Sequence, residues 1–196
     1  MNVLIIYAHP NPESFNAAIC DAVEKEFTSK EFQVRKRDLY QMKFDPILKE
    51  DDYTSFYQDK IPADIQAEQK EIIWADILVF VFPTWWTGMP AILKGYFDRV
   101  FTNGFAFRYA DEGPEGLLKE KQALIFQTTG QPEKSLKPPQ LTMAMQAVFD
   151  IGIMNFCGIE TLAHKFIYSV QYVDEETRQI MLNEVREVVE MIGKPQ

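Results

Sequence analysis

The chain has 196 residues, a net charge of −9 and 46% hydrophobic residues. This length suits one domain, and a domain of this size buries enough surface to fold without a disulfide or a metal. The negative charge argues against a nucleic-acid partner, because phosphate binding needs clustered lysine and arginine. No apolar run approaches the ~20 residues of a membrane span. With only two cysteines and a start directly on a strand-like run, we expect a cytoplasmic protein.

The first half of the chain alternates between strand-like and helix-like segments. Asn2–Tyr7 is an apolar run that ends in a turn-rich stretch, which is typical of a buried strand. From Ser14 onward the apolar residues recur at threes and fours, which predicts a helix. Phe32–Asp38 alternates and predicts a more exposed strand, and Ala63–Trp74 predicts a second helix. The intervening residues 41–62 are irregular, acidic and aromatic.

The second half continues the same alternation. Ile77–Phe82 has the continuous apolar character of a strand that is buried on both faces. The further expected elements are a loop at 83–90, a helix over Ala91–Phe101, a strand over Gln122–Thr128, a helix over Pro138–Gly152, a strand within Phe156–Val170 and a helix over Glu175–Ile192 with Asp174 as its N-cap. This order predicts one α/β domain over residues 1–196, with a doubly wound parallel five-stranded sheet and helices on both faces.

In a sheet of this kind, ligands bind outside the carboxyl ends of the strands, which directs attention to three loops. The first, at 8–16, leads from the first strand to a helix start. Ser14 and Asn16 are good capping residues there, and the helix start offers free N–H groups to a phosphate. The alternative is that Ser14 only caps the helix and His9 is a solvated loop residue.

The second loop carries the sharpest signal, because it contains the adjacent residues Trp85 and Trp86. A core can hardly take both side chains, so they could form an aromatic wall beside free backbone N–H groups, as a planar heteroaromatic ligand requires. The alternative is an ordinary packing cluster. The third loop, Thr128-Thr129-Gly130-Gln131, offers two hydroxyls and a glycine for close approach, although the same residues also suit a plain turn.

Four other features have simpler expected roles. The alternating aromatics of Phe105–Tyr109 either pack on their own core or present one face to a flat substrate. We expect Lys49–Asp52 to be a solvated face, His164 to be a surface or structural residue, and Cys157 to be a small core residue. With two histidines and two cysteines in the chain, no metal site is expected.

The order of these motifs resembles the NAD(P)H:quinone oxidoreductase family, also called DT-diaphorase, and its bacterial relatives. The most specific match is Phe82-Pro83-x-x-Trp86-x-Gly88-x-Pro90 followed by Ala91–Gly95. The other matching segments are 8–9, 14–16, 38–40, 64–65, 67–70, 75–76, 99–101, 105–106, 128–130, 156–158 and 168–169. The resemblance covers nearly the whole chain and implies a flavodoxin-like fold.

The resemblance also implies the cofactor and its site. The expected cofactor is FAD, with FMN as the alternative, and NAD(P)H is the expected cosubstrate. By position, the pyrophosphate and ribityl side would be held by His9, Phe15 and Asn16 with Ser14. The isoalloxazine would be lined, mainly through backbone groups, by Pro83, Thr84, Trp85, Trp86 and Thr87, and its pyrimidine edge would be contacted by Thr128, Thr129 and Gly130. The adenine half would be held by Arg178 and Leu182.

The implied activity is a two-electron ping-pong transfer of hydride from NAD(P)H through flavin N5 to quinones or similar flat acceptors. No protein residue is expected to be catalytic, because the flavin carries the chemistry. Trp86 and Phe156 would line the substrate pocket, and Phe107 and Tyr109 would close it from the partner subunit of a homodimer. The alternatives are a flavodoxin-type electron carrier and a regulatory flavoprotein subunit of a potassium-efflux system.

The chain departs from the family pattern after Thr-Thr-Gly. The mammalian relatives carry there a longer, glycine-rich loop with a Tyr and a His that help to neutralise the reduced flavin. The present loop is shorter and contains neither residue, and we hypothesise that Lys134 or Lys137 supplies positive charge instead. One of the family's paired pocket tyrosines is Phe107, and the shorter region at 53–62 lacks an adenine contact.

Overall fold

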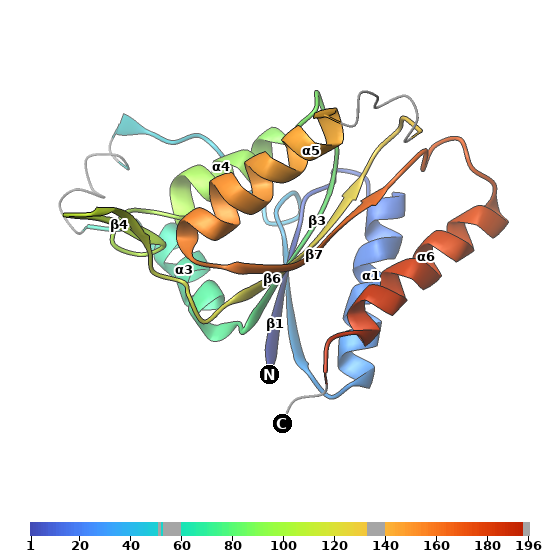
Figure 1. Ribbon diagram of the computed structural model, residues 1–196, viewed down its shortest axis with the longest axis horizontal. Coiled ribbons are helices and arrows are strands. Elements are labelled where there is room, and N and C mark those ends of the chain that lie inside the picture. The colour runs from blue at the N-terminus through green and yellow to red at the C-terminus, as the bar shows by residue number, and fades with distance from the viewer. Residues whose placement is uncertain (51, 53–59, 133–139, 194–196) are drawn as a thin grey trace.

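The computed structural model describes residues 1–50, 52, 60–132 and 140–193. A five-stranded sheet in the order β2-β1-β3-β6-β7 forms its centre, and all neighbouring strands are parallel (Figure 1). The strands are β1 (Asn2–Tyr7), β2 (Gln33–Asp38), β3 (Ile77–Pro83), β6 (Gln122–Thr128) and β7 (Glu160–Ile167). This order is the flavodoxin-like one, and it confirms the predicted doubly wound sheet.

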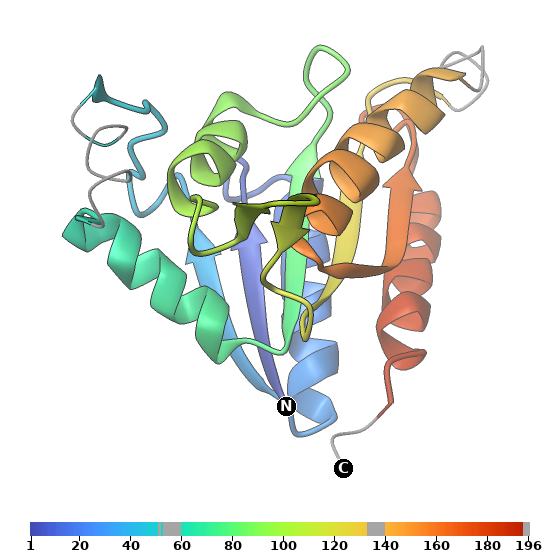
Figure 2. The ribbon, with the colours of Figure 1, turned by 60° about the vertical axis from the view of Figure 1, so that its left-hand side comes forward.

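Helices cover both faces of the sheet (Figure 2). On one face lie α1 (Phe15–Ser29) and α6 (Glu175–Glu190), and on the other lie α3 (Ala63–Trp74), α4 (Ala91–Val100) and a π-helical segment, η2 (Ala147–Met154). A short α-helix, α5 (Gln140–Gln146), leads into η2, and a 3₁₀ turn, η3 (Asn155–Cys157), follows it. None of the described helices has both the length and the hydropathy that crossing a membrane requires.

The central strands are buried on both faces, as their continuous apolar runs predict. In β1, Val3 and Ile5 pack under α1 and α6, whereas Leu4 and Ile6 pack under α3 and α4. A parallel sheet that helices cover on both sides leaves no solvent-facing position in such strands. The edge strand β2 has no such requirement, and its alternating polar residues are partly exposed.

Two predicted helix caps are present. The side chain of Ser14 accepts a hydrogen bond from the Ala17 amide at 3.2 Å, and that of Asp174 accepts one from the Thr177 amide at 2.8 Å. Each cap satisfies an amide that has no acceptor within its helix, which stabilises a helix by about 1 kcal/mol.

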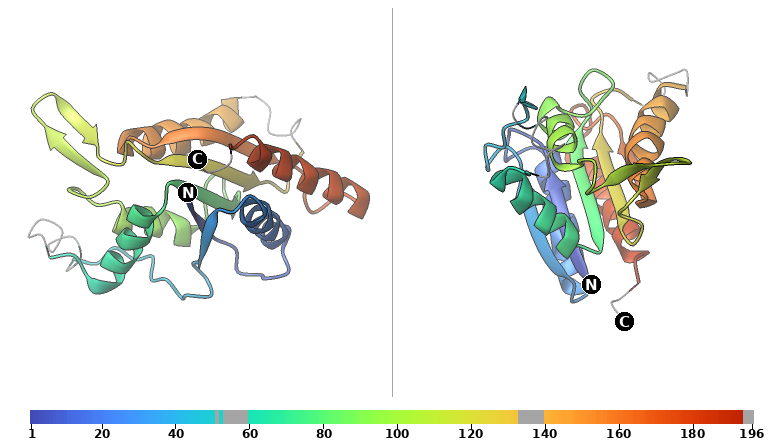
Figure 3. Two further views of the ribbon diagram at one scale, coloured as in Figure 1. Left: turned by 90° about the horizontal axis from the view of Figure 1, so that it is seen from below. Right: turned by 90° about the vertical axis from the view of Figure 1, so that its left-hand side faces the viewer.

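Residues 107–116 form a small hairpin apart from the main sheet. Its antiparallel strands are β4 (Phe107–Ala110) and β5 (Gly113–Gly116), and it projects from one end of the molecule (Figure 3). Glycine is required where the hairpin meets η3, because a Cβ on Gly116 would lie 2.3 Å from the Cys157 carbonyl carbon.

The expectation of a solvated face at Lys49–Asp52 is wrong for Asp52. Its carboxylate is buried and accepts a hydrogen bond from Arg99 Nε of α4 at 2.8 Å. Arg99 also pairs with Asp64 of α3 at 3.1 Å and donates to the Asp45 carbonyl at 2.9 Å. A buried carboxylate is tolerated only when it is paired, and here the partner comes from α4.

Candidate functional site

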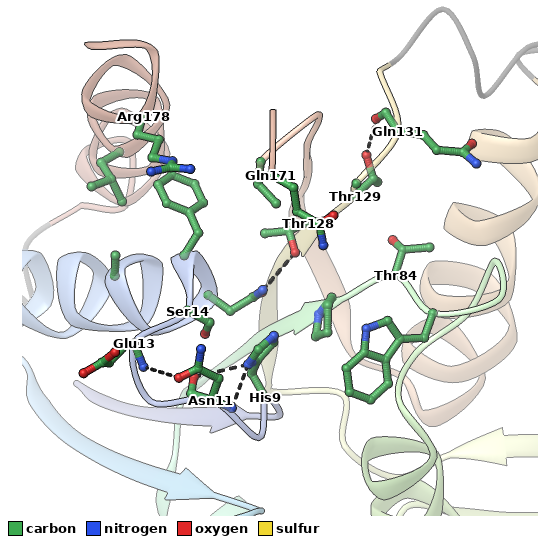
Figure 4. Close-up of a pocket in the computed structure, with 18 of the residues that line it drawn as sticks. His9, Asn11, Glu13, Ser14, Thr84, Thr128, Thr129, Gln131, Gln171 and Arg178 are labelled. Carbon is green, nitrogen blue, oxygen red and sulfur yellow. Dashed lines mark hydrogen bonds between the residues drawn. The ribbon is translucent and has the colours of Figure 1, made fainter. Parts of the chain in front are cut away.

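A cavity of about 1050 Å³ opens at the carboxyl ends of β1, β3 and β6 (Figure 4). This is where strand order reverses, between β1 and β3, as expected for a ligand site in an open α/β sheet. Every residue that the sequence predicts as cofactor-binding lines it: His9, Ser14, Phe15, Asn16, Pro83, Thr84, Trp85, Trp86, Thr87, Thr128, Thr129, Gly130, Arg178 and Leu182. The structure thus brings these residues together, and their roles remain predictions.

The first loop is held by its own polar groups at the start of α1. His9 Nδ1 accepts from the Asn11 amide at 3.0 Å, and Asn11 Oδ1 accepts from the Glu13 amide at 2.9 Å. Burial lowers the pKa of His9 from its usual value. The first amides of α1 have no acceptor within the helix, so this wall of the cavity can bind an anion.

Asn16 ties the first loop to the third. Its buried side-chain amide donates to Thr128 Oγ1 at 2.9 Å, across the end of the sheet. Thr129 is held separately, because its hydroxyl donates to the Gln131 carbonyl at 2.6 Å. Both hydroxyls therefore have defined positions on the cavity wall.

The second loop is a tight, strained turn. Trp85 and Gly88 exchange two backbone hydrogen bonds of 2.9 and 3.0 Å, and the residues between them, Trp86 and Thr87, have φ values of 50° and 61°. Positive φ at both central residues is the type I′ pattern, which normally selects Asn-Gly. Strain of this kind persists mainly at ligand sites.

The two tryptophans do not pack in the core. Trp86 is fully exposed and Trp85 is 40% exposed, with its ring 6.1 Å from the ring of His9. The structure thus rules out the alternative of an ordinary packing cluster. Large exposed aromatics beside a concave polar site suit a flat ligand.

Arg178 provides a direct test of whether a nucleotide cofactor fits. Its side chain comes from α6, above the start of α1 (Figure 4), and its Nε atom is buried without a hydrogen-bond partner in the described part of the chain. A buried, unpaired guanidinium N–H is costly, and an acceptor on a bound ligand would satisfy it. Leu182, one turn further along α6, adds an apolar surface beside it. These residues fit the nucleotide half of a flavin.

The predicted substrate aromatics lie elsewhere. The rings of Phe107 and Phe156 are 4.9 Å apart, and those of Phe107 and Tyr109 are 5.8 Å apart. This cluster sits on the projecting hairpin and η3, and none of its members lines the cavity. Phe107 packs within the chain, whereas Tyr109 is 74% exposed. Within one chain, Trp86 is therefore separated from the other predicted substrate residues.

Some cavity residues were not predicted. Asn11 and Glu13 lie in the first loop, where the residue types alone did not single them out. Gln171 follows the carboxyl end of β7, and its Oε1 would lie 3.5 Å from a Cβ placed on Gly130. The strand-end rule, applied to β7, would have found it. The hypothesised cations Lys134 and Lys137 lie outside the described residues.

The site contains no activated thiol. Burial raises the pKa of both Cys20 and Cys157 to about 12, so neither is a thiolate at neutral pH. Cys157 is a buried core residue, as predicted, and the side chain of His164 is fully buried and does not lie at the surface. The start of α1 and the exposed tryptophans equip the cavity to bind a flat, phosphate-bearing molecule.

Comparison with known proteins agrees with this description. Residues 1–190 match the model of a family described as having a flavodoxin-like fold. An NAD(P)H oxidoreductase of Haemophilus influenzae is 38% identical over 93% of this chain and 91% of that protein. NAD(P)H dehydrogenase (quinone) 1 of Cavia porcellus is 35% identical over 91% of this chain and 72% of that protein.

A solved structure gives the same answer at the level of the fold. The NAD(P)H:quinone oxidoreductase of Methanothermobacter marburgensis superposes with a TM-score of 0.87 and 28% identity, over 96% of this chain and 97% of that one. With the strand order, the cavity and these matches together, the chain belongs to the NAD(P)H:quinone oxidoreductase family of flavodoxin-like proteins.

Proposed function

We propose that the protein is a cytoplasmic, flavin-dependent reductase that uses NAD(P)H to reduce quinones or similar flat acceptors. The observation that carries the proposal is the single cavity in which the three strand-end loops meet α6. It combines a helix start, a strained aromatic turn and a buried, unpaired arginine donor. Curated relatives at 38% and 35% identity are named as an NAD(P)H oxidoreductase and an NAD(P)H dehydrogenase (quinone).

The residues of the chain would bind and orient the cofactor. The start of α1, with His9 beside it, would hold the pyrophosphate. The turn at Trp85–Gly88 would lie along the ring system, and Thr128 and Thr129 would contact its polar edge. A bound flavin would supply the redox chemistry, taking a hydride equivalent from NAD(P)H and passing it to the acceptor in a separate half-reaction.

The shape of the cavity favours FAD over FMN. The cavity runs from the tryptophan turn to α6, and its volume of about 1050 Å³ is slightly above the range of roughly 300–1,000 Å³ that is usual for ligand sites. FMN would end at the start of α1 and would leave Arg178 Nε unpaired. FAD would place its adenine half against Arg178 and Leu182.

We further propose that two copies form a dimer that completes the substrate site. Val148, Ile151 and Met143 of α5 and η2 are each more than 60% exposed, and Leu141 at the start of the same segment lines the cavity. An apolar face of this kind marks an interface. A second copy on this face would bring its Tyr109 and Phe107 to the neighbouring cavity, where a quinone would stack.

The test starts with the purified protein. Released flavin is identified by chromatography, and the holoprotein is mixed with NADPH and then with menadione under a spectrometer. Bleaching by NADPH and recovery with quinone would support the reductase and assign the flavin. A bound flavin that NAD(P)H cannot reduce would point to an electron carrier or a regulatory subunit instead. Absence of flavin binding would refute the proposal.

The dimer is tested by sedimentation. We expect the wild-type protein to sediment as a dimer and Ile151→Glu to sediment as a monomer. Ile73 of α3 is similarly exposed at 63%, against 67% for Ile151, but lies on another surface. Ile73→Glu is therefore the matched control and should remain dimeric. A monomeric wild type would refute the interface.

A further inference from the structure

A line of four hydrogen-bonded side chains runs behind the cavity and ends at its wall. Asp150 Oδ1 of η2 lies 2.8 Å from His164 Nδ1 of β7, and His164 Nε2 lies 3.0 Å from Gln127 Oε1 of β6. Gln127 Nε2 then donates to Thr84 Oγ1 at 2.8 Å. Thr84 follows β3 and lines the cavity, so the line connects a buried histidine to the ligand site.

The inner members of this line are held rigidly. The side chain of His164 is fully buried, stacks on Phe166 at 4.5 Å and meets the ring of Phe149 edge-on at 5.8 Å. Gln127 is 2% exposed. Buried polar groups at such positions are costly unless each donor and acceptor is satisfied, so the direction of every bond in the line matters.

Met145 determines the direction in which the Gln127 amide points. Its sulfur lies 3.5 Å from Gln127 Nε2, and a thioether can only accept a hydrogen bond. The NH₂ group therefore faces both Met145 and Thr84, while the amide oxygen faces His164. Since that oxygen only accepts, the Nε2 atom of His164 must carry a proton, and Nδ1 must carry one as well, because the Asp150 carboxylate that it faces also only accepts.

This arrangement leaves the Thr84 hydroxyl with a free proton. Its oxygen accepts from Gln127, and no acceptor in the described part of the chain takes its O–H. Its backbone amide is already used, because it donates to the Thr128 carbonyl at 2.7 Å. The O–H is therefore available to donate into the cavity.

We propose that Gln127 and His164 are positioning residues that hold the Thr84 hydroxyl as a hydrogen-bond donor to the flavin ring. The proposal rests on the proposed function. A fixed donor against the ring stabilises the electron-rich reduced form more than the oxidised form. Thr84 thus contributes through its side chain, whereas the family resemblance implies contacts that this loop makes mainly through backbone groups.

The first test needs no flavin. The chain has two histidines, so the variant His9→Asn leaves the His164 ring as the single imidazole in a long-range ¹H–¹⁵N spectrum. We expect both Nδ1 and Nε2 to be protonated. An unprotonated Nε2 would reverse the bond between His164 and Gln127 and the bond between Gln127 and Thr84, turn the Thr84 proton toward Gln127 and overturn the proposal.

The second test uses the holoprotein and measures the ratio of its affinities for reduced and oxidised flavin. Thr84→Val should lower this ratio about tenfold, equivalent to ~30 mV for a two-electron couple, and Thr84→Ser should restore it. Gln127→Glu keeps the shape but accepts from both neighbours, so it should capture the Thr84 proton and lower the ratio similarly. Gln33→Glu, at an exposed position of β2, adds the same charge and should leave the ratio unchanged.

A double variant separates positioning from simple charge. If Gln127 acts through Thr84, Gln127→Glu should have little further effect in the Thr84→Val background. An equal effect in both backgrounds, or an unchanged ratio in Thr84→Val, would overturn the proposal. If the wild type binds no flavin, the proposed function fails, and the ring spectrum still decides the direction of the hydrogen bonds.

Discussion

Replacing Thr87 by glycine should relieve the backbone strain in the turn that follows β3. Thr87 is exposed, β-branched and held at a φ of 61°. A left-handed backbone costs a non-glycine residue ~1–2 kcal/mol. Glycine avoids this cost, but it loses more chain entropy on folding, and this loss cancels ~0.5–1 kcal/mol of the relieved strain. We therefore expect Thr87→Gly to stabilise the flavin-free protein by about 0.5–1 kcal/mol.

The assay is urea unfolding of the flavin-free protein. Thermal unfolding gives a second readout, because at this chain length 1 kcal/mol corresponds to a rise in Tm of ~2–4 °C. Thr28→Gly is the matched control, because Thr28 is also exposed but lies in the last turn of α1, where the lower helix propensity of glycine relative to threonine should cost ~0.3–0.5 kcal/mol. If Thr87→Gly lowers the free energy of unfolding as Thr28→Gly does, the turn stores no strain.

The same substitution should weaken flavin binding. A strained turn that is already in its bound conformation pays no ordering cost when the ligand arrives. Glycine would let the free turn sample other conformations, so flavin affinity should fall several-fold although the fold becomes more stable. Titration of the flavin-free protein measures this, and an affinity equal to wild type would contradict the idea that the turn is preorganised.

Three further outcomes are expected. Burial lowers the pKa of His9, and a bound phosphate would raise it, so flavin binding takes up a proton. The affinity for flavin, measured by titration, should therefore rise as the pH falls between about pH 8 and 5, and this pH dependence should vanish in His9→Asn. Arg178→Ala should weaken FAD by ~10–100-fold, from the ~1.5–3 kcal/mol of a charge-assisted hydrogen bond, and leave FMN unchanged; equal losses would refute the adenine assignment. Gly95→Ala should lower the free energy of unfolding, measured with urea, by ~1–3 kcal/mol, because its Cβ would lie 2.2 Å from the Pro46 carbonyl oxygen. An unchanged free energy would show that residues 45–50 move to make room for the methyl group.

Local patterns were sufficient to predict most of the framework. The apolar runs of β1, β3 and β6 are continuous because both faces of the strands are covered, and that signal lies within each run. The caps at Ser14 and Asp174 act on amides three residues away. The location of the cavity followed from the same strands, because parallel strands bring their carboxyl ends to one edge of the sheet.

Properties that depend on distant partners were beyond the reach of these patterns. The local sequence predicts a solvent-exposed carboxylate at Asp52, but the ion pair with Arg99, 47 residues away, makes its burial possible. Nothing in the local pattern of residues 147–154 indicates a π-helix. Whether Trp85 and Trp86 pack inside or face solvent depended on the turn geometry that places them at the cavity.

The sequence by itself thus determined the order of strands and helices, their caps and the edge at which a ligand binds. The tertiary structure alone decided which side chains meet behind that edge. His164 lies on β7, Gln127 on β6 and Thr84 directly after β3, and the direction of their hydrogen bonds depends on Met145 of α5. Hydrogen-bond direction is a property of donors and acceptors within about 3 Å of each other, and only the folded chain sets those distances.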